Sequence, residues 1–118
     1  MELETERLDD GIEKLTLAGR MDGAGVEEID LRFTALTATR KALILVDLSR
    51  VSFLASIGIR ALVINAKALR QRGGFMALLK PQPLVAEVLK TAGIEMVIPT
   101  FDDLALALGA LKTSAAGT

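Results

Sequence analysis

The sequence of 118 residues contains no cysteine, no histidine, no tryptophan and no tyrosine. Without cysteine, the chain has no disulfide bond, no thiol nucleophile and no thiolate metal ligand. Without histidine, it lacks the side chain that most often serves as a general base or as a zinc ligand. No pattern of lysines or carboxylates identifies a nucleophile together with its base. We therefore expect no metal, no cofactor and no catalytic residue, and we predict that the protein is not an enzyme.

Strong charge and long apolar runs are also missing. The formal net charge is −1, and the sequence shows neither a basic cluster nor an aromatic platform for nucleic acid. The apolar runs are far too short to span a membrane, and the acidic N-terminus lacks the pattern of a signal peptide. We expect a cytoplasmic protein with no nucleic-acid partner and no membrane-inserted segment.

Aliphatic residues are what the sequence has in abundance. Hydrophobic residues make up 51% of the chain and aromatic residues only 3%, so the core must be aliphatic. The length suits one domain, which we place at residues 1–112. Residues 113–118 are small and polar, and we expect them to form a flexible tail.

Hydrophobic periodicity divides the chain into strands and helices. The pattern predicts strands at residues 2–8, 12–18, 42–49, 75–79 and 96–98, and helices beginning near Val26, Ile57, Pro83 and Leu104. A turn signal at residues 9–11 predicts a hairpin between the first two strands. The sequence from Thr100 to Asp103 resembles a capping box before the last helix.

The order of these elements is ββαβαβαβα. Strands that alternate with helices are joined by right-handed crossovers, which make them parallel neighbours in one sheet. The opening hairpin adds an antiparallel edge to that sheet. We therefore predict an α/β fold in which helices pack on a small mixed β-sheet.

The glycine-rich segment from Gly19 to Gly25 admits two interpretations. Gly23-Ala24-Gly25 begins the G-x-G pattern of a nucleotide-binding loop, which would indicate a small nucleotide-binding enzyme. The third glycine is absent, because Glu28 stands in its place, and no G-K-[ST] follows. The simpler interpretation is a tight turn before a helix. Asp22 would then lie at the carboxyl end of a strand, where such folds gather functional residues.

The stretch from Ala42 to Arg72 carries most of the functional signal. A buried strand at residues 42–49 is followed by a short loop that delivers Ser56 to the start of a helix. Ser56 is placed to act as the N-cap of that helix. The same position tolerates a phosphate, because a helix N-terminus favours anions. Phosphorylation would add a charge of about −1.5 to −2 at this point.

The helix after Ser56 carries two apolar stripes. One stripe is expected to pack on the sheet, and the other is covered by neighbouring helices or left to face solvent or a partner. The first comprises Ile59, Leu62, Val63, Ala66 and Leu69; the second comprises Ile57, Ala61, Ile64 and Ala68, flanked by Arg60, Lys67 and Gln71. A phosphate on Ser56 would lie at the edge of the second stripe and oppose docking there.

The run from Val46 to Ile59, V-D-L-S-R-V-S-F-L-A-S-I-G-I, resembles the signature of the STAS domain, a family that includes the bacterial anti-sigma factor antagonists. The family pattern is a strand ending in D-[LF]-S, a loop, and a D-S-x-G turn into a helix. The segment from Gly19 to Asp22 is similar to the family's G-x-[LM]-D. The resemblance extends to about Leu111, and the STAS fold that it implies has the element order predicted above.

The resemblance also implies a function. An unphosphorylated antagonist of this type binds a cognate anti-sigma factor, which is a serine kinase, and so frees the sigma factor. The kinase phosphorylates the serine of D-S-x-G and releases the antagonist, and a PP2C-type phosphatase reverses the step. The resemblance makes Ser56 the phospho-acceptor, Gly58 the turn glycine and Asp22 an acidic residue near the site. It implies a partner-binding surface of Asp22, Ser56, Ile57, Gly58, Arg60, Ala61 and Ile64.

Two positions depart from the family pattern. Ala55 replaces the aspartate before the serine, and Ile57 replaces a frequent serine or threonine. The departure at Ala55 leaves a second hypothesis open, in which the chain is a scaffolding or transporter-associated STAS domain that is not phosphorylated. The second stripe also leaves open a homodimer in place of a complex with another protein.

Overall fold

The computed structural model describes residues 1–38 and 41–116. These residues form a five-stranded sheet and four α-helices in the order ββαβαβαβα, which confirms the predicted α/β class and element order. The strands are β1 (Glu2–Arg7), β2 (Ile12–Met21), β3 (Leu43–Leu54), β4 (Phe75–Leu79) and β5 (Thr100–Phe101). The helices are α1 (Gly23–Thr37), α2 (Ser56–Gln71), α3 (Pro83–Thr91) and α4 (Leu104–Ala116).

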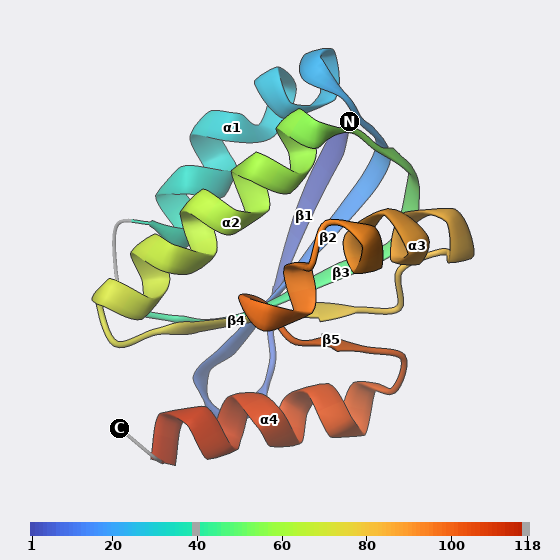
Figure 1. The fold of residues 1–118 in the computed structure, drawn as a ribbon. Helices are drawn as coiled ribbons and strands as arrows, with labels where there is room; N and C mark the ends of the chain where they lie inside the picture. Colours follow the sequence, from blue (N-terminus) through green and yellow to red (C-terminus); the bar gives the residue numbers. More distant parts are fainter. Residues whose placement is uncertain (39–40, 117–118) are drawn as a thin grey trace.

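The sheet is mixed, with its strands in the order β1-β2-β3-β4-β5. β1 and β2 pair antiparallel in the predicted hairpin, and the remaining neighbours pair in parallel. Helices α1, α2 and α3 cover one face of the sheet, while α4 covers the other (Figure 1). Among the helices in the described part of the chain, none is long and apolar enough to cross a membrane.

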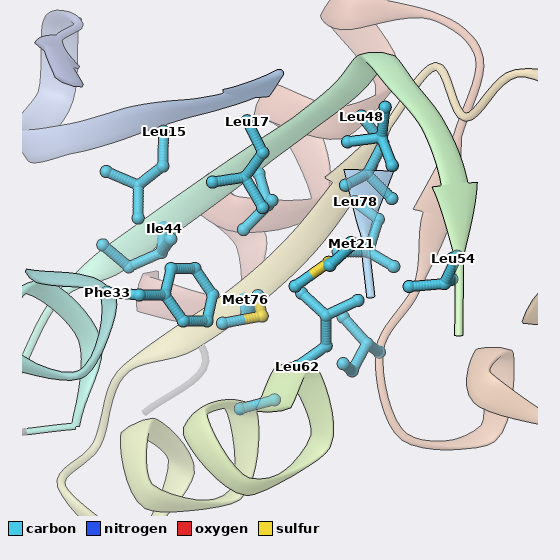
Figure 2. Packing of buried hydrophobic residues seen from close by; sticks show 14 of the residues in the cluster. Leu15, Leu17, Met21, Phe33, Ile44, Leu48, Leu54, Leu62, Met76 and Leu78 are labelled. Carbon is cyan, nitrogen blue, oxygen red and sulfur yellow. The ribbon is translucent and has the colours of Figure 1, made fainter. Parts of the chain in front are cut away.

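The aliphatic core lies on both faces of the sheet. Alternation along β3 directs Ile44 and Leu48 toward the α1–α2 side and Leu45 toward α4. Figure 2 shows Phe33 of α1 and Leu62 of α2 packed over the face of the sheet that these two helices cover. Burial on both faces explains why the start of β3 is a continuous apolar run.

Two strands extend further than periodicity predicts. β2 continues to Met21 instead of ending at Ala18, and β3 continues through residues 50–54, which the sequence assigns to a loop. The two extensions pair with each other across small irregularities in the register. The pattern misses this part of β3 because only Val51 and Leu54 in it are buried.

The predicted strand at residues 96–98 is wrong. Ile94–Met96 form a 3₁₀ turn, and β5 begins only at Thr100. Ile94 and Ile98 are buried, so this irregular segment still contributes to the core. Three apolar residues in a row do not distinguish a strand from a buried turn.

The start and end of α4 also differ from expectation. Thr100 belongs to β5 and does not cap the helix; Asp103 Oδ1 instead accepts a hydrogen bond from the Leu106 amide at 3.1 Å. Residues 113–116, which the sequence assigns to a flexible tail, continue α4. Residues 117–118 of that predicted tail lie outside the described residues.

A close approach between two backbones builds the β3–α2 junction. The Ala55 amide donates to the Met21 carbonyl oxygen at 3.1 Å and ties the end of β3 to the end of β2. A Cβ added at Gly58 would lie 2.8 Å from that oxygen and 2.7 Å from Leu54 Cδ1. Gly58 is therefore required for close packing in the first turn of α2, where the resemblance implied a turn glycine.

Ser56 is the first residue of α2 and not its N-cap. The N-cap is Ala55, whose backbone is extended, with φ −94° and ψ 169°, and whose side chain makes no capping hydrogen bond. Spacing alone puts the cap one residue too late, because β3 runs to Leu54 and leaves a single residue between strand and helix.

Replacing Gly58 with alanine is expected to destabilise the fold, because the new methyl group would collide with backbone and side-chain atoms. We expect a loss of about 1–3 kcal/mol, or a Tm lower by about 4–12 °C in thermal unfolding followed by circular dichroism. Gly109→Ala is the matched control, since nothing lies within 4 Å of a Cβ added there, and its Tm should rise slightly. An unchanged Tm for Gly58→Ala would contradict the packing argument.

Replacing Ala55 with aspartate is expected to stabilise the fold, because an N-cap carboxylate accepts a hydrogen bond from a free amide of the first helical turn. The expected gain is about 1 kcal/mol at pH 7, or a Tm higher by about 4 °C. Ala55→Val, which cannot cap, is the control and should show no gain. If aspartate and valine gave the same Tm, the N-cap assignment would be wrong.

Candidate functional site

The carboxyl ends of β2 and β3 bring two helix starts together. β2 leads into α1 through Asp22, and β3 leads into α2 through Ala55. Because β2 and β3 are parallel neighbours, both helices begin at the same end of the sheet, where these strands finish. The two helices pack side by side (Figure 1). The hydrogen bond from Ala55 to Met21 joins the two junctions. The fold thus places Asp22 and Ser56 at adjacent junctions.

Asp22 is the N-cap of α1. Its Oδ1 accepts a hydrogen bond from the Gly25 amide at 2.9 Å, and its Oδ2 lies 3.4 Å from Arg20 Nε. The Gly25 amide, with a further contribution from Arg20, lowers the pKa of Asp22 below its ordinary value, so this carboxylate is ionised at neutral pH. The guanidinium of Arg20 also stacks on Phe53, 4.2 Å from the ring centroid.

Ser56 is exposed at the first position of α2. Its hydroxyl makes no hydrogen bond to any residue in the described part of the chain. Amides at the start of a helix favour an added negative charge. The Ser56 oxygen is therefore both accessible and placed where a modification that adds charge would be tolerated by the helix.

A groove of about 450 Å³ lies between α1 and α2, beside the start of both helices. Its walls combine apolar side chains with charges of both signs. Ile57 and Ile64 of α2 are 47% and 53% exposed, and Arg60 lies between them in the sequence. α1 contributes Glu27 and Asp30 to the lining. The groove is thus a partly apolar surface with mixed charge.

Three of the four residues of the second stripe predicted on α2 line this groove: Ile57, Ala61 and Ile64. The flanking Arg60 lines it as well, Ala61 is partly buried, and Ala68 is not part of the lining. Gly58, which the resemblance includes in the partner-binding surface, is buried and so acts through packing instead of direct contact.

Sequence reasoning missed the contribution of α1. Glu27 and Asp30 resemble the solvated side of an isolated helix, and only the packing of α1 against α2 makes them a wall of the groove. A buried polar contact fixes that packing: the Thr37 hydroxyl donates to Asn65 Oδ1 at 2.8 Å, and Asn65 Nδ2 donates to the Ala61 carbonyl oxygen at 2.8 Å. Spacing within one helix carries no signal of which residues lie across from it.

A second groove, of about 600 Å³, lies where β3, α2 and α3 meet. Phe53, Leu84 and Val88 in its lining are 40%, 73% and 36% exposed. Ile59 lines it as well and is only partly buried, although periodicity places that residue in the core stripe. Ile57 and Ile59 project from different sides of α2, so the two grooves flank the start of this helix.

The D-L-S segment of β3 has a structural role. Asp47 Oδ1 accepts a hydrogen bond from the Ser49 amide at 2.8 Å, and Asp47 Oδ2 lies 3.4 Å from Lys14 Nζ. Burial raises the pKa of Asp47, but the Ser49 hydrogen bonds and Lys14 outweigh burial, and the net effect is a lowered pKa. The buried acid is therefore a paired, ionised contact between neighbouring strands.

The glycine-rich segment packs tightly at the start of α1. A Cβ added at Gly25 would overlap the Arg20 carbonyl oxygen, so this glycine serves a close backbone approach. That geometry supports the tight-turn interpretation of residues 19–25. Within the described residues, no group of three or more carboxylates is arranged to hold a metal ion.

Comparison with known proteins identifies relatives of the whole chain. The model of the STAS domain matches residues 5–107. A Bordetella bronchiseptica protein provisionally named as the anti-sigma factor antagonist BtrV is 28% identical over 114 residues, which cover 97% of each chain. The unphosphorylated anti-sigma factor antagonist SpoIIAA superposes with a TM-score of 0.73 at 21% identity, covering 95% of this chain and 97% of that chain.

Two further structures share the fold. Phosphorylated SpoIIAA from Bacillus has a TM-score of 0.65 at 20% identity, covering 92% of this chain and 98% of its own. The STAS domain of a SulP transporter from Vibrio cholerae has a TM-score of 0.68 at 20% identity, and the match covers 94% of this chain and 88% of the other. Since the STAS model spans residues 5–107, this chain belongs to the STAS domain family, together with anti-sigma factor antagonists.

Proposed function

We propose that this chain is an anti-sigma factor antagonist that binds an anti-sigma factor with serine kinase activity, and that phosphorylation of Ser56 switches the binding off. The observation that carries the proposal is the free Ser56 hydroxyl beside a groove with exposed apolar walls at Ile57 and Ile64. The relatives support it: BtrV is provisionally named an antagonist, and SpoIIAA is described in unphosphorylated and phosphorylated forms.

The proposed reaction requires no catalytic residue from this chain. The Ser56 oxygen attacks the γ-phosphorus of ATP bound to the anti-sigma factor, and the bond from that phosphorus to the β,γ-bridging oxygen breaks. ADP leaves, and the hydroxyl proton passes to a base of the kinase. A PP2C-type phosphatase reverses the modification by directing water to the phosphorus, which restores the hydroxyl and releases inorganic phosphate.

A phosphate on Ser56 opposes docking without unfolding α2. It adds a charge of about −1.5 to −2, which the free amides at the helix start tolerate. Ile57, the next residue, would then bury its side chain against a partner beside a solvated dianion. Removing water from such a charge without a matching partner costs several kcal/mol. The unphosphorylated chain is therefore the form that binds.

Ala55 changes how the kinase would recognise its target. The family aspartate before the serine is absent, and Asp22 is already engaged in capping α1 and in its contact with Arg20. We therefore assign recognition to the α1–α2 groove and Ile57, with no acid at position 55.

A second candidate function is a scaffolding or transporter-associated STAS domain that is not phosphorylated. Ala55 favours it, and so does the match to the STAS domain of a SulP transporter. Co-purification from the source organism separates the candidates. A kinase-like anti-sigma factor in the eluate supports the first; a large assembly of this chain or a membrane complex supports the second. A stable dimer of the isolated chain would assign the second stripe to self-association.

Ser56→Asp is expected to weaken partner binding and Ser56→Ala to preserve it, because only aspartate adds charge beside Ile57. We expect aspartate to reduce the amount of anti-sigma factor captured by the tagged chain from cell extract by about tenfold, equivalent to about 1.4 kcal/mol. Quantitative mass spectrometry of the eluate measures the effect. Equal capture by both variants would place the switch elsewhere.

Ile64→Lys is expected to weaken partner binding with little change in stability, because Ile64 is 53% exposed in the groove. Its Tm should stay within about 2 °C of the unmodified chain, as for surface substitutions in general. Leu106→Lys, at a residue 65% exposed on α4 across the sheet, is the matched control and should bind normally. Similar capture by the two variants would exclude the α1–α2 groove as the docking surface.

A further inference from the structure

Ser56 and Arg60 share one side of α2. They are four residues apart, a spacing that puts Cβ atoms about 5–6 Å apart on a helix. Ser56 precedes Arg60, and an anion that precedes a cation at this spacing is the more favourable order. A phosphate on Ser56, as in the function proposed above, would therefore lie within reach of the Arg60 guanidinium.

The Arg60 side chain makes no competing polar contact among the residues that the structure describes. It is exposed, and within the described residues it makes no hydrogen bond and no ion pair. Arg20, Arg32 and Arg72, by contrast, are each held by an oxygen acceptor of this chain. No existing ion pair would have to break for Arg60 to turn toward a phosphate.

Arg60 is also the only basic side chain among the described residues that line the α1–α2 groove. The other charges in that lining are the carboxylates of Glu27 and Asp30. We propose that Arg60 is the internal counter-ion of phosphorylated Ser56, so that phosphorylation withdraws this cation from the groove. The modification then alters the docking surface twice, through the phosphate itself and through the loss of a positive contact for the partner.

The pairing does not depend on a kinase, so the test uses the full chain with phosphoserine incorporated at position 56 during translation. A ³¹P NMR titration at low salt gives the second pKa of the phosphate. We expect this pKa to rise by about 0.3 units in Arg60→Gln, the size of a helix ion pair at this spacing. Lys67→Gln, on the same helix but about three turns from Ser56, is the matched control and should leave this pKa unchanged.

The amides of the first helical turn are the same in every variant, so the comparison isolates Arg60. Equal pKa values in the unsubstituted chain and Arg60→Gln would overturn the proposal, as would an equal rise in Lys67→Gln. A ¹⁵N spectrum provides a second readout: the Arg60 Nε–H signal, identified by its loss in Arg60→Gln, should shift on phosphorylation. An unmoved signal would also count against the pair.

The two proposals fail in distinguishable ways. The NMR experiment contains no partner, so a negative result removes the counter-ion role and leaves the antagonist function intact. Loss of the Ser56→Asp effect on partner capture removes the antagonist switch and leaves the measured pairing of phosphate and Arg60 unaffected.

Discussion

The hydrogen bond between the Ala55 amide and the Met21 carbonyl oxygen is the contact on which the geometry of this site depends. Gly58 packs against the same oxygen, so the first turn of α2 is held against the end of β2. Because β2 also leads directly into α1, this contact ties the starts of the two helices together. The Thr37–Asn65 hydrogen bond fixes the two helices again further along their length. The groove beside Ser56 exists because the helices are fixed at both places.

The residues at this junction fall into two groups: those that stabilise the fold and those whose side chains are available to a partner. Asp22, Gly58 and the first stripe of α2 are engaged in capping or packing, whereas the side chains of Ser56, Ile57 and Arg60 are exposed. Residues that contribute little to folding are free to change with the partner. Ala55 and Ile57, which differ from the family pattern, both lie at this junction.

Most of the fold is predictable from the sequence because its signals are local. The apolar run at the start of β3 indicates burial on both faces, and helical spacing separates the buried Leu62 from the exposed Ile64 on α2. Signals that depend on a neighbour are not predictable in this way. Residues 50–54 form a strand because β2 is long enough to pair with them, and Glu27 lines a groove because α2 lies beside α1. The N-cap of α2 is Ala55 and not the predicted Ser56 for the same reason, since the length of β3 decides where α2 begins.

The proposed phosphorylation switch depends on Ser56 at this junction. It is tested by intact-mass and phosphopeptide analysis of the chain purified from its source organism, beside the Ser56→Ala variant. We predict the added mass of one phosphate, located on the peptide that contains Ser56 and absent from the variant. A chain that carries no phosphate would contradict this prediction and favour a STAS domain that works as an unmodified scaffold. A phosphate that persists in Ser56→Ala would also contradict it and would place the modification at another residue.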